Sequence, residues 1–99
     1  MTIAVNHEYC ADEQVALSEL SRAGFDASTV DYAPGRTEPH QHDYDICLHI
    51  IEGEFRVTDV DEGVVHNCGP GTKLFVSSGT RHFEDHDAVK LVVGRRHQT

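Results

Sequence analysis

The apolar positions divide the chain into one helical segment and a longer region of short strands. In residues 12–23, apolar side chains recur at the spacing of a helix face, at Ala16, Leu17, Leu20 and Ala23. Asp12 can cap the start of this helix and Gly24 can end it. We therefore expect one short N-terminal helix, which packs against something larger.

After Gly24, short segments rich in β-branched and aromatic residues alternate with turns that contain Gly, Pro or acidic residues. The expected strands are 27–33, 37–42, 45–52, 54–59, 64–68, 72–77, 81–85 and 88–94. Eight short strands at intervals of about 8–12 residues indicate an antiparallel barrel or sandwich. The prediction is a single all-β domain over residues 1–99, with the barrel at about 27–94.

Composition narrows this picture to one lean core. A chain of 99 residues is too short for two cores. Only 38% of its residues are hydrophobic, and tryptophan is absent. A homodimer that buries one outer sheet face would relieve this shortage of apolar residues, so we expect self-association.

Charge and cysteine usage exclude several classes of protein. The formal net charge is −9, which repels phosphate backbones and argues against a nucleic-acid partner. The chain contains Cys10, Cys47 and Cys68 but no Cys-x-x-Cys pair, which argues against a zinc ribbon and against a thioredoxin-like redox protein. The N-terminus lacks a signal-like segment, and no apolar run reaches membrane-spanning length. We expect a cytoplasmic protein with reduced thiols and no membrane partner.

Three histidines stand out as candidate metal ligands. His40 and His42 are two residues apart, and if Gln41 lies in a strand their side chains share one face. His82 follows the turn at 78–81 and could come from a later strand to complete the set. Three neutral imidazoles inside a barrel form a metal site with open positions. The metal would be divalent iron, manganese, nickel or zinc, among which the sequence does not choose.

Together with Gly35, Gly53 and Pro70-Gly71, the three histidines resemble the two motifs of the cupin family. Gly35, His40-Gln41-His42 and Gly53 stand close to the places of the first motif, with four residues between Gly35 and His40 where the family has about five. Pro70-Gly71 and the turn before His82 resemble the second motif.

In the turn before His82, Ser77 stands where the second cupin motif usually has proline. The match covers about half the chain, and the run His40-Gln41-His42-Asp43-Tyr44-Asp45 is also similar to small stand-alone bacterial cupins. The resemblance implies a cupin-type double-stranded β-helix, a jelly-roll barrel, more firmly than it implies a reaction.

The carboxylate of the resembled motif is displaced in this chain. The expected position is Ile46, whereas Asp45 stands one residue earlier. A slip of one residue reverses the face of a strand, so Asp45 could reach the metal only if the strand bulges there or starts after it. Otherwise the site is three histidines with waters, and Asp45 could orient an imidazole from behind the ligands.

The same choice of register decides which side chains line the pocket. Ile46 and Leu48 share one face of their strand, while Cys47 and His49 share the other. If the register follows Ile46, Cys47 and His49 belong to the outer face or a dimer interface. If it follows Asp45, both would line the pocket.

Two classes of function follow. In the first, the metal coordinates a small oxygen-rich or thiol-bearing ligand and acts in an enzyme such as a dioxygenase or an isomerase. In the second, the barrel is a non-catalytic binding or sensor module, because no clear general base is evident: Asp45 is uncertain and Glu84 lies on a strand of undetermined register. A metal-free barrel whose histidines fill a polar core ranks last. Catalytic residues are not identified.

Overall fold

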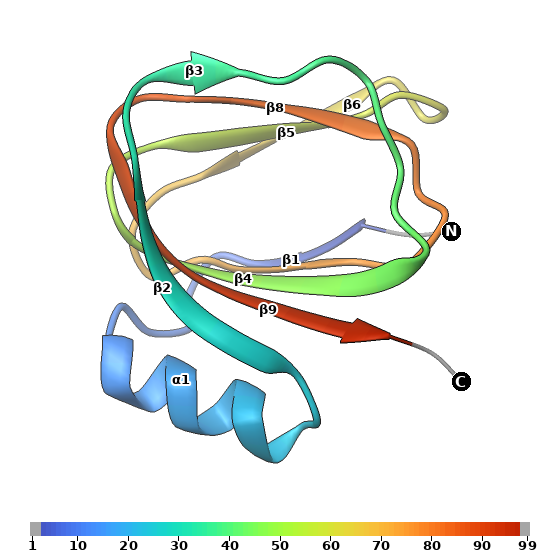
Figure 1. Cartoon of the computed structure of the whole chain (residues 1–99). Coiled ribbons are helices and arrows are strands. Elements are labelled where there is room, and N and C mark those ends of the chain that lie inside the picture. The colour runs from blue at the N-terminus through green and yellow to red at the C-terminus, as the bar shows by residue number, and fades with distance from the viewer. Residues whose placement is uncertain (1–2, 98–99) are drawn as a thin grey trace.

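Two antiparallel sheets face each other in the computed structural model, which describes residues 3–97. The larger sheet has the strand order β1 (Ile3–Asn6), β7 (Lys73–Val76), β4 (Tyr44–Glu52), β9 (Val89–His97) and β2 (Asp26–Tyr32). The smaller has the order β3 (Gly35–Arg36), β8 (His82–His86), β5 (Phe55–Asp59) and β6 (Val64–Cys68). Figure 1 shows the two sheets stacked, with the helix outside the larger one. This arrangement is the expected all-β jelly-roll barrel.

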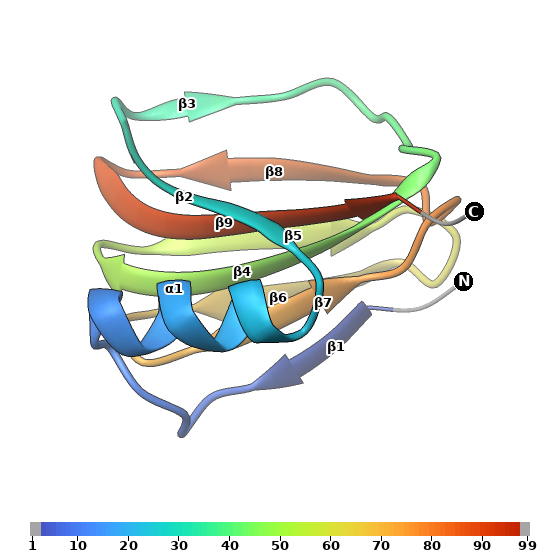
Figure 2. The ribbon, with the colours of Figure 1, turned by 60° about the horizontal axis from the view of Figure 1, so that its bottom comes forward.

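Both ends of the helix α1 (Glu13–Arg22) lie within one residue of the predicted range 12–23. The Asp12 carboxylate accepts a hydrogen bond from the Val15 N–H at 3.0 Å, which satisfies one of the free donors of the first turn. The apolar face of α1 packs on the outside of the larger sheet, in a cluster that contains Ala16, Leu20, Phe25, Cys47 and Val92. Figure 2 shows α1 lying across this outer face. Within residues 3–97, no helix is long and apolar enough to cross a bilayer.

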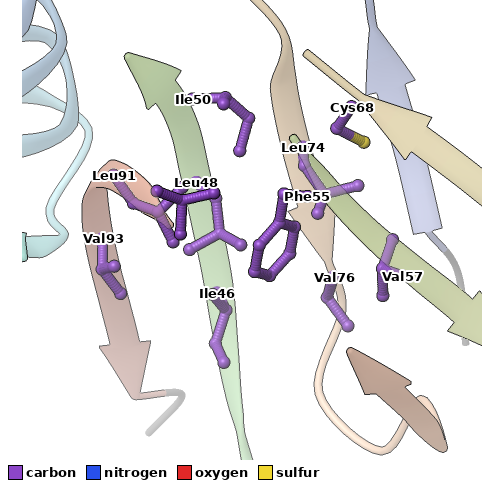
Figure 3. Close-up of a cluster of buried hydrophobic side chains, with 11 residues drawn as sticks. Ile46, Leu48, Ile50, Phe55, Val57, Cys68, Leu74, Val76, Leu91 and Val93 are labelled. Atoms are coloured by element: carbon purple, nitrogen blue, oxygen red, sulfur yellow. The ribbon is translucent and has the colours of Figure 1, made fainter. Parts of the chain in front are cut away.

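The main core lies between the two sheets. Alternate residues of β4 and β9 point inward and meet Phe55 and Val57 of the smaller sheet. Figure 3 shows the Phe55 ring placed between side chains of the larger sheet. The buried members are Ile46, Leu48, Ile50, Phe55, Val57, Cys68, Leu74, Val76, Val89, Leu91 and Val93. The alternation settles the register of β4, because Ile46 and Leu48 face the interior.

The structure corrects the expected strand at 37–42. This segment is a connection that runs along one end of the barrel from β3 to β4, as Figure 1 shows. It contacts β8 of the smaller sheet through hydrogen bonds between Thr37 and Glu84 and through an isolated bridge between His40 and His82, without forming a continuous ladder. Pro39 lies within it and has no N–H for a strand ladder.

The structure also adds the edge strand β1, which was not expected from the sequence. Ile3 and Val5 pack against the main core while β1 pairs with β7. A strand this short carries little local signal, and its pairing with residues 73–76 depends on the fold.

Candidate metal centre

Three imidazoles meet at the end of the barrel where the 37–43 connection crosses. His40, His42 and His82 each offer a ring nitrogen, and these atoms lie within 4.8 Å of one another. The bridge holds the backbones together, because the His40 N–H donates to the His82 carbonyl at 2.8 Å and the His82 N–H donates to the His40 carbonyl at 2.9 Å. The Gly79 N–H holds the His42 carbonyl at 2.8 Å. Hydrogen bonds between segments far apart in the sequence, rather than strand alternation, therefore bring the three rings together.

Main-chain carbonyls orient two of the rings. The Nδ1 atom of His40 lies 2.7 Å from the Glu38 carbonyl oxygen, and the Nδ1 atom of His82 lies 2.8 Å from that of Thr80. Since a carbonyl can only accept, each Nδ1 carries the proton. In the neutral tautomer the Nε2 lone pair is then free to bind a metal, which is how metal-binding histidines are commonly held. The donor set therefore fits a divalent metal ion.

Glu84 is the residue at this centre that the sequence reasoning left unassigned. Its Oε1 lies 3.4 Å from His82 Nε2 and its Oε2 lies 3.6 Å from His40 Nε2. The side chain is 17% exposed, and its Oε2 accepts a hydrogen bond from the Thr37 hydroxyl at 2.8 Å. The signal that could have found it is the alternation His82-x-Glu84, which puts both side chains on one face of β8.

Burial and neighbouring groups change the protonation of this cluster. Burial lowers the pKa of His42, and the nearby His40 and His82 lower it further. Burial alone would lower the pKa of His82, but Glu84 and the Thr80 carbonyl outweigh it and raise that pKa. Burial alone would likewise raise the pKa of Glu84, yet its contacts with His82 and Thr37 lower it. An ionised carboxylate thus faces two imidazoles, a charge pattern that suits a cation.

Asp45 has different partners. Its side chain is 3% exposed, its Oδ1 accepts from the Ser78 N–H at 2.9 Å, and its Oδ2 accepts from the Arg96 guanidinium at 3.1 Å. Asp45 is not part of the histidine cluster described above. The register irregularity of β4 falls between Ile50 and Glu52, at the far end of the strand from Asp45. The irregularity of β4 is therefore not at the position where a bulge would turn Asp45 toward the histidine cluster.

A cavity of about 440 Å³ adjoins the centre. Its polar lining includes His42 and Glu84, and Arg95 is also part of the wall. Ile46 and Leu48, two candidate pocket residues, line it together with other core side chains: Phe55, Leu91 and Val93. The space beside the centre is therefore mainly apolar.

The other two candidate pocket residues, Cys47 and His49, lie on the opposite face of β4. Cys47 belongs to the cluster under α1, and burial raises the pKa of its thiol to about 11. His49 is 0% exposed, neither ring nitrogen has a hydrogen-bond partner, and its ring meets Tyr9 edge-on with the centroids 5.4 Å apart. Both follow the register set by Ile46, so they do not line the cavity.

Comparison with solved structures shows the same fold in other proteins. A DUF861 family protein from Thermotoga maritima is 16% identical, with 93% of this chain and 97% of that chain covered and a TM-score of 0.67. A putative mannose-6-phosphate isomerase from Ralstonia eutropha JMP134 is 14% identical, with 78% of each chain covered and a TM-score of 0.67. These likenesses show that the fold of this chain recurs in other proteins.

The polyketide cyclase RemF from Streptomyces resistomycificus is 25% identical over 72% of this chain and 54% of its own length, with a TM-score of 0.61. No curated protein sequence matches the chain. The cupin domain family, however, matches residues 28–90, which span both histidine motifs. The chain therefore belongs to the cupin family.

Proposed function

We propose that this cupin holds a divalent metal ion with His40, His42 and His82 and binds a small molecule in the adjoining cavity. The observation that carries the proposal is the convergence of three imidazoles at one end of that cavity. Three protein ligands leave positions open for a ligand or water. A bound metal would supply Lewis-acid chemistry, polarising a carbonyl or hydroxyl group. Iron, manganese, nickel and zinc all suit histidine with carboxylate.

The cavity favours a ligand with an apolar body and few polar atoms. Its volume of about 440 Å³ lies in the range of small-molecule sites. Ile46, Leu48 and other core side chains make the walls mainly apolar, and Arg36 and His86 add polar groups besides those of His42 and Glu84 at the histidine end. An oxygen or sulfur donor at that end would reach the metal, and Arg95 in the wall could pair with an anionic group.

Turnover by a dioxygenase- or isomerase-type reaction is one version of this function. Glu84 supports it, because an ionised carboxylate beside the metal ligands could accept a proton from a bound molecule. The alternative is a sensor that binds the same ligand without turnover. The lining favours this second candidate, because Glu84 is the only carboxylate among the described residues that line the cavity and it lies beside the histidines. Oxygen-uptake and isomerase assays with β-diketones and thiols separate the two.

Metal analysis tests the proposal directly. Protein without an affinity tag, produced with iron, manganese, nickel and zinc supplied, is expected to retain about one metal ion per chain. The His42→Ala variant should lose it because one of three imidazole ligands is gone. His7→Ala, which removes an exposed histidine, is the matched control and should keep the metal. Wild-type protein without metal, after reconstitution with each ion, would overturn the proposal.

A further inference from the structure

The carboxylate beside the three histidines comes from β8, whereas the first cupin motif would place it on β4. We propose that Glu84 of β8 is the fourth metal ligand and that Thr37 positions its carboxylate. This inference deepens the proposed function and depends on the metal site formed by His40, His42 and His82. It assigns the ligand to the second histidine motif, two residues after His82, instead of the first motif.

The distances from Glu84 to His40 and His82 suit ligands of a shared ion. Among the described residues, only the three histidines form the group whose ligand atoms all lie within 4.8 Å of one another, so the carboxylate would shift toward His42 to complete the set. The separations of 3.4 Å from Glu84 to His82 Nε2 and 3.6 Å to His40 Nε2 exceed the usual N–H···O hydrogen bond of about 2.7–3.2 Å. Two ligand atoms that are each about 2.1 Å from a tetrahedral ion lie about 3.4 Å apart. Both Nε2 atoms belong to rings whose Nδ1 atoms are already bound to carbonyl oxygens. The carboxylate therefore faces the atoms that are available for metal binding.

Strand parity explains why β8 supplies the carboxylate. On β4 the inward position is occupied by Ile46, and Asp45 is engaged by Arg96 and the Ser78 N–H. On β8, His82 and Glu84 are two residues apart and so share one face. A carboxylate from β8 reaches the histidines without any bulge.

Thr37 holds this carboxylate in place through reciprocal contacts. Its hydroxyl donates to Glu84 Oε2 at 2.8 Å and accepts from the Glu84 N–H at 2.9 Å. The Thr37 N–H in turn donates to the Glu84 carbonyl at 2.9 Å. Hydrogen bonds of this kind behind a ligand orient it and raise metal affinity. Thr37 is therefore a positioning residue.

The test is a titration of Co²⁺ into chelator-stripped full-length protein, followed by visible absorption and by competition with a chelator. Glu84→Gln is expected to weaken Co²⁺ binding more than about 100-fold, beyond the loss typical of residues behind the ligands. It should also change the cobalt absorption bands, because the ligand set changes. Thr37→Val, which lacks the hydroxyl, should weaken binding about 10-fold.

The matched control is Asp85→Asn. Asp85 neighbours Glu84 on β8, but its carboxylate pairs with Arg56, so the Co²⁺ affinity should stay within about 2-fold of wild type. Asp45→Asn tests the rival carboxylate and should also leave the affinity and the absorption bands unchanged. Circular dichroism and urea unfolding verify that each variant is folded.

The outcomes separate this inference from the proposed function. If wild type binds no Co²⁺, both fail. If wild type binds and Glu84→Gln binds equally well with an unchanged spectrum, only the role of Glu84 is overturned; the same holds if Asp45→Asn alone abolishes binding. If Glu84→Gln does not fold, Glu84→Asp replaces it, because its carboxylate is one methylene shorter. Unchanged affinity and spectrum in that variant would also overturn the inference.

Discussion

At the scale of single residues, main-chain carbonyl groups orient two of the three imidazoles of the candidate metal centre. The carbonyls of Glu38 and Thr80 each lie two residues before the histidine that they orient. Orientation by so local a contact needs no distant partner, so it forms together with the turn that carries the ligand. His42 differs, since its ring is placed by stacking on Tyr44 with the centroids 4.8 Å apart. The orientation of this third candidate ligand therefore depends on the start of β4.

His49 provides a residue-scale prediction about acid stability. Burial lowers its pKa, an effect that Glu19 opposes and Lys73 reinforces. In the unfolded chain the pKa is near 6.5. Because the folded pKa is the lower one, the unfolded state takes up the proton first as the pH falls. The stability associated with neutral His49 is therefore present above about pH 6.5 and is lost below it, by at most about 1.4 kcal/mol per pH unit.

Urea unfolding at about pH 7.5 and pH 5.5 checks this. His49→Leu, with a similar volume and no ring nitrogens, should lose less stability between the two values than wild type. His7→Leu removes an exposed imidazole instead and should behave like wild type. An identical pH dependence in wild type and His49→Leu would contradict the prediction.

At the scale of elements, the two turns that flank β5 differ in how tightly they are packed. Gly53, between β4 and β5, has φ +88°, and a Cβ there would lie 2.2 Å from the Ala88 carbonyl oxygen. Gly63, between β5 and β6, has φ +67° but nothing within 4 Å of the same added atom. Both positions require the left-handed backbone region, and only Gly53 also requires the absence of a side chain.

Alanine at each glycine separates these two requirements. Gly63→Ala should lower the free energy of unfolding by about 1–2 kcal/mol, the cost of a left-handed backbone for an L-residue. Gly53→Ala should cost about 1–3 kcal/mol more, because the Ala88 carbonyl has to move. Chemical denaturation of both variants measures the difference. Equal losses would show that the contact with residue 88 relaxes without cost.

At the scale of the whole molecule, the proposed metal would connect the two sheets. His82 belongs to β8 of the smaller sheet, whereas His42 leads into β4 of the larger one. An ion held by the folded chain and not by the unfolded chain stabilises it by mass action. At a free metal concentration 100 times the dissociation constant, the gain is about 2.7 kcal/mol.

Thermal unfolding of chelator-stripped protein, with and without added Zn²⁺, measures this coupling. The unfolding midpoint of wild type should rise as the metal concentration rises. His42→Ala should show no rise, and His7→Ala should follow wild type. A midpoint that stays constant while the wild-type chain binds the ion would mean that the unfolded chain holds it equally well.

The expected homodimer and cytoplasmic location stay predictions of the composition.

Local periodicity and the spacing between turns were enough to predict the fold class, the helix and the candidate metal-binding histidines. The contact between these histidines, and the carboxylate beside them, depend on pairing between distant segments. His40 and His82 meet through a bridge between segments 42 residues apart in the chain, and no local pattern reports such a pairing. The register of β4 was ambiguous until the core buried Ile46 and Leu48, which directed Asp45 to Arg96. The pairing of β8 with β5 sets Glu84 opposite the buried Val57, so its side chain lies beside the histidines.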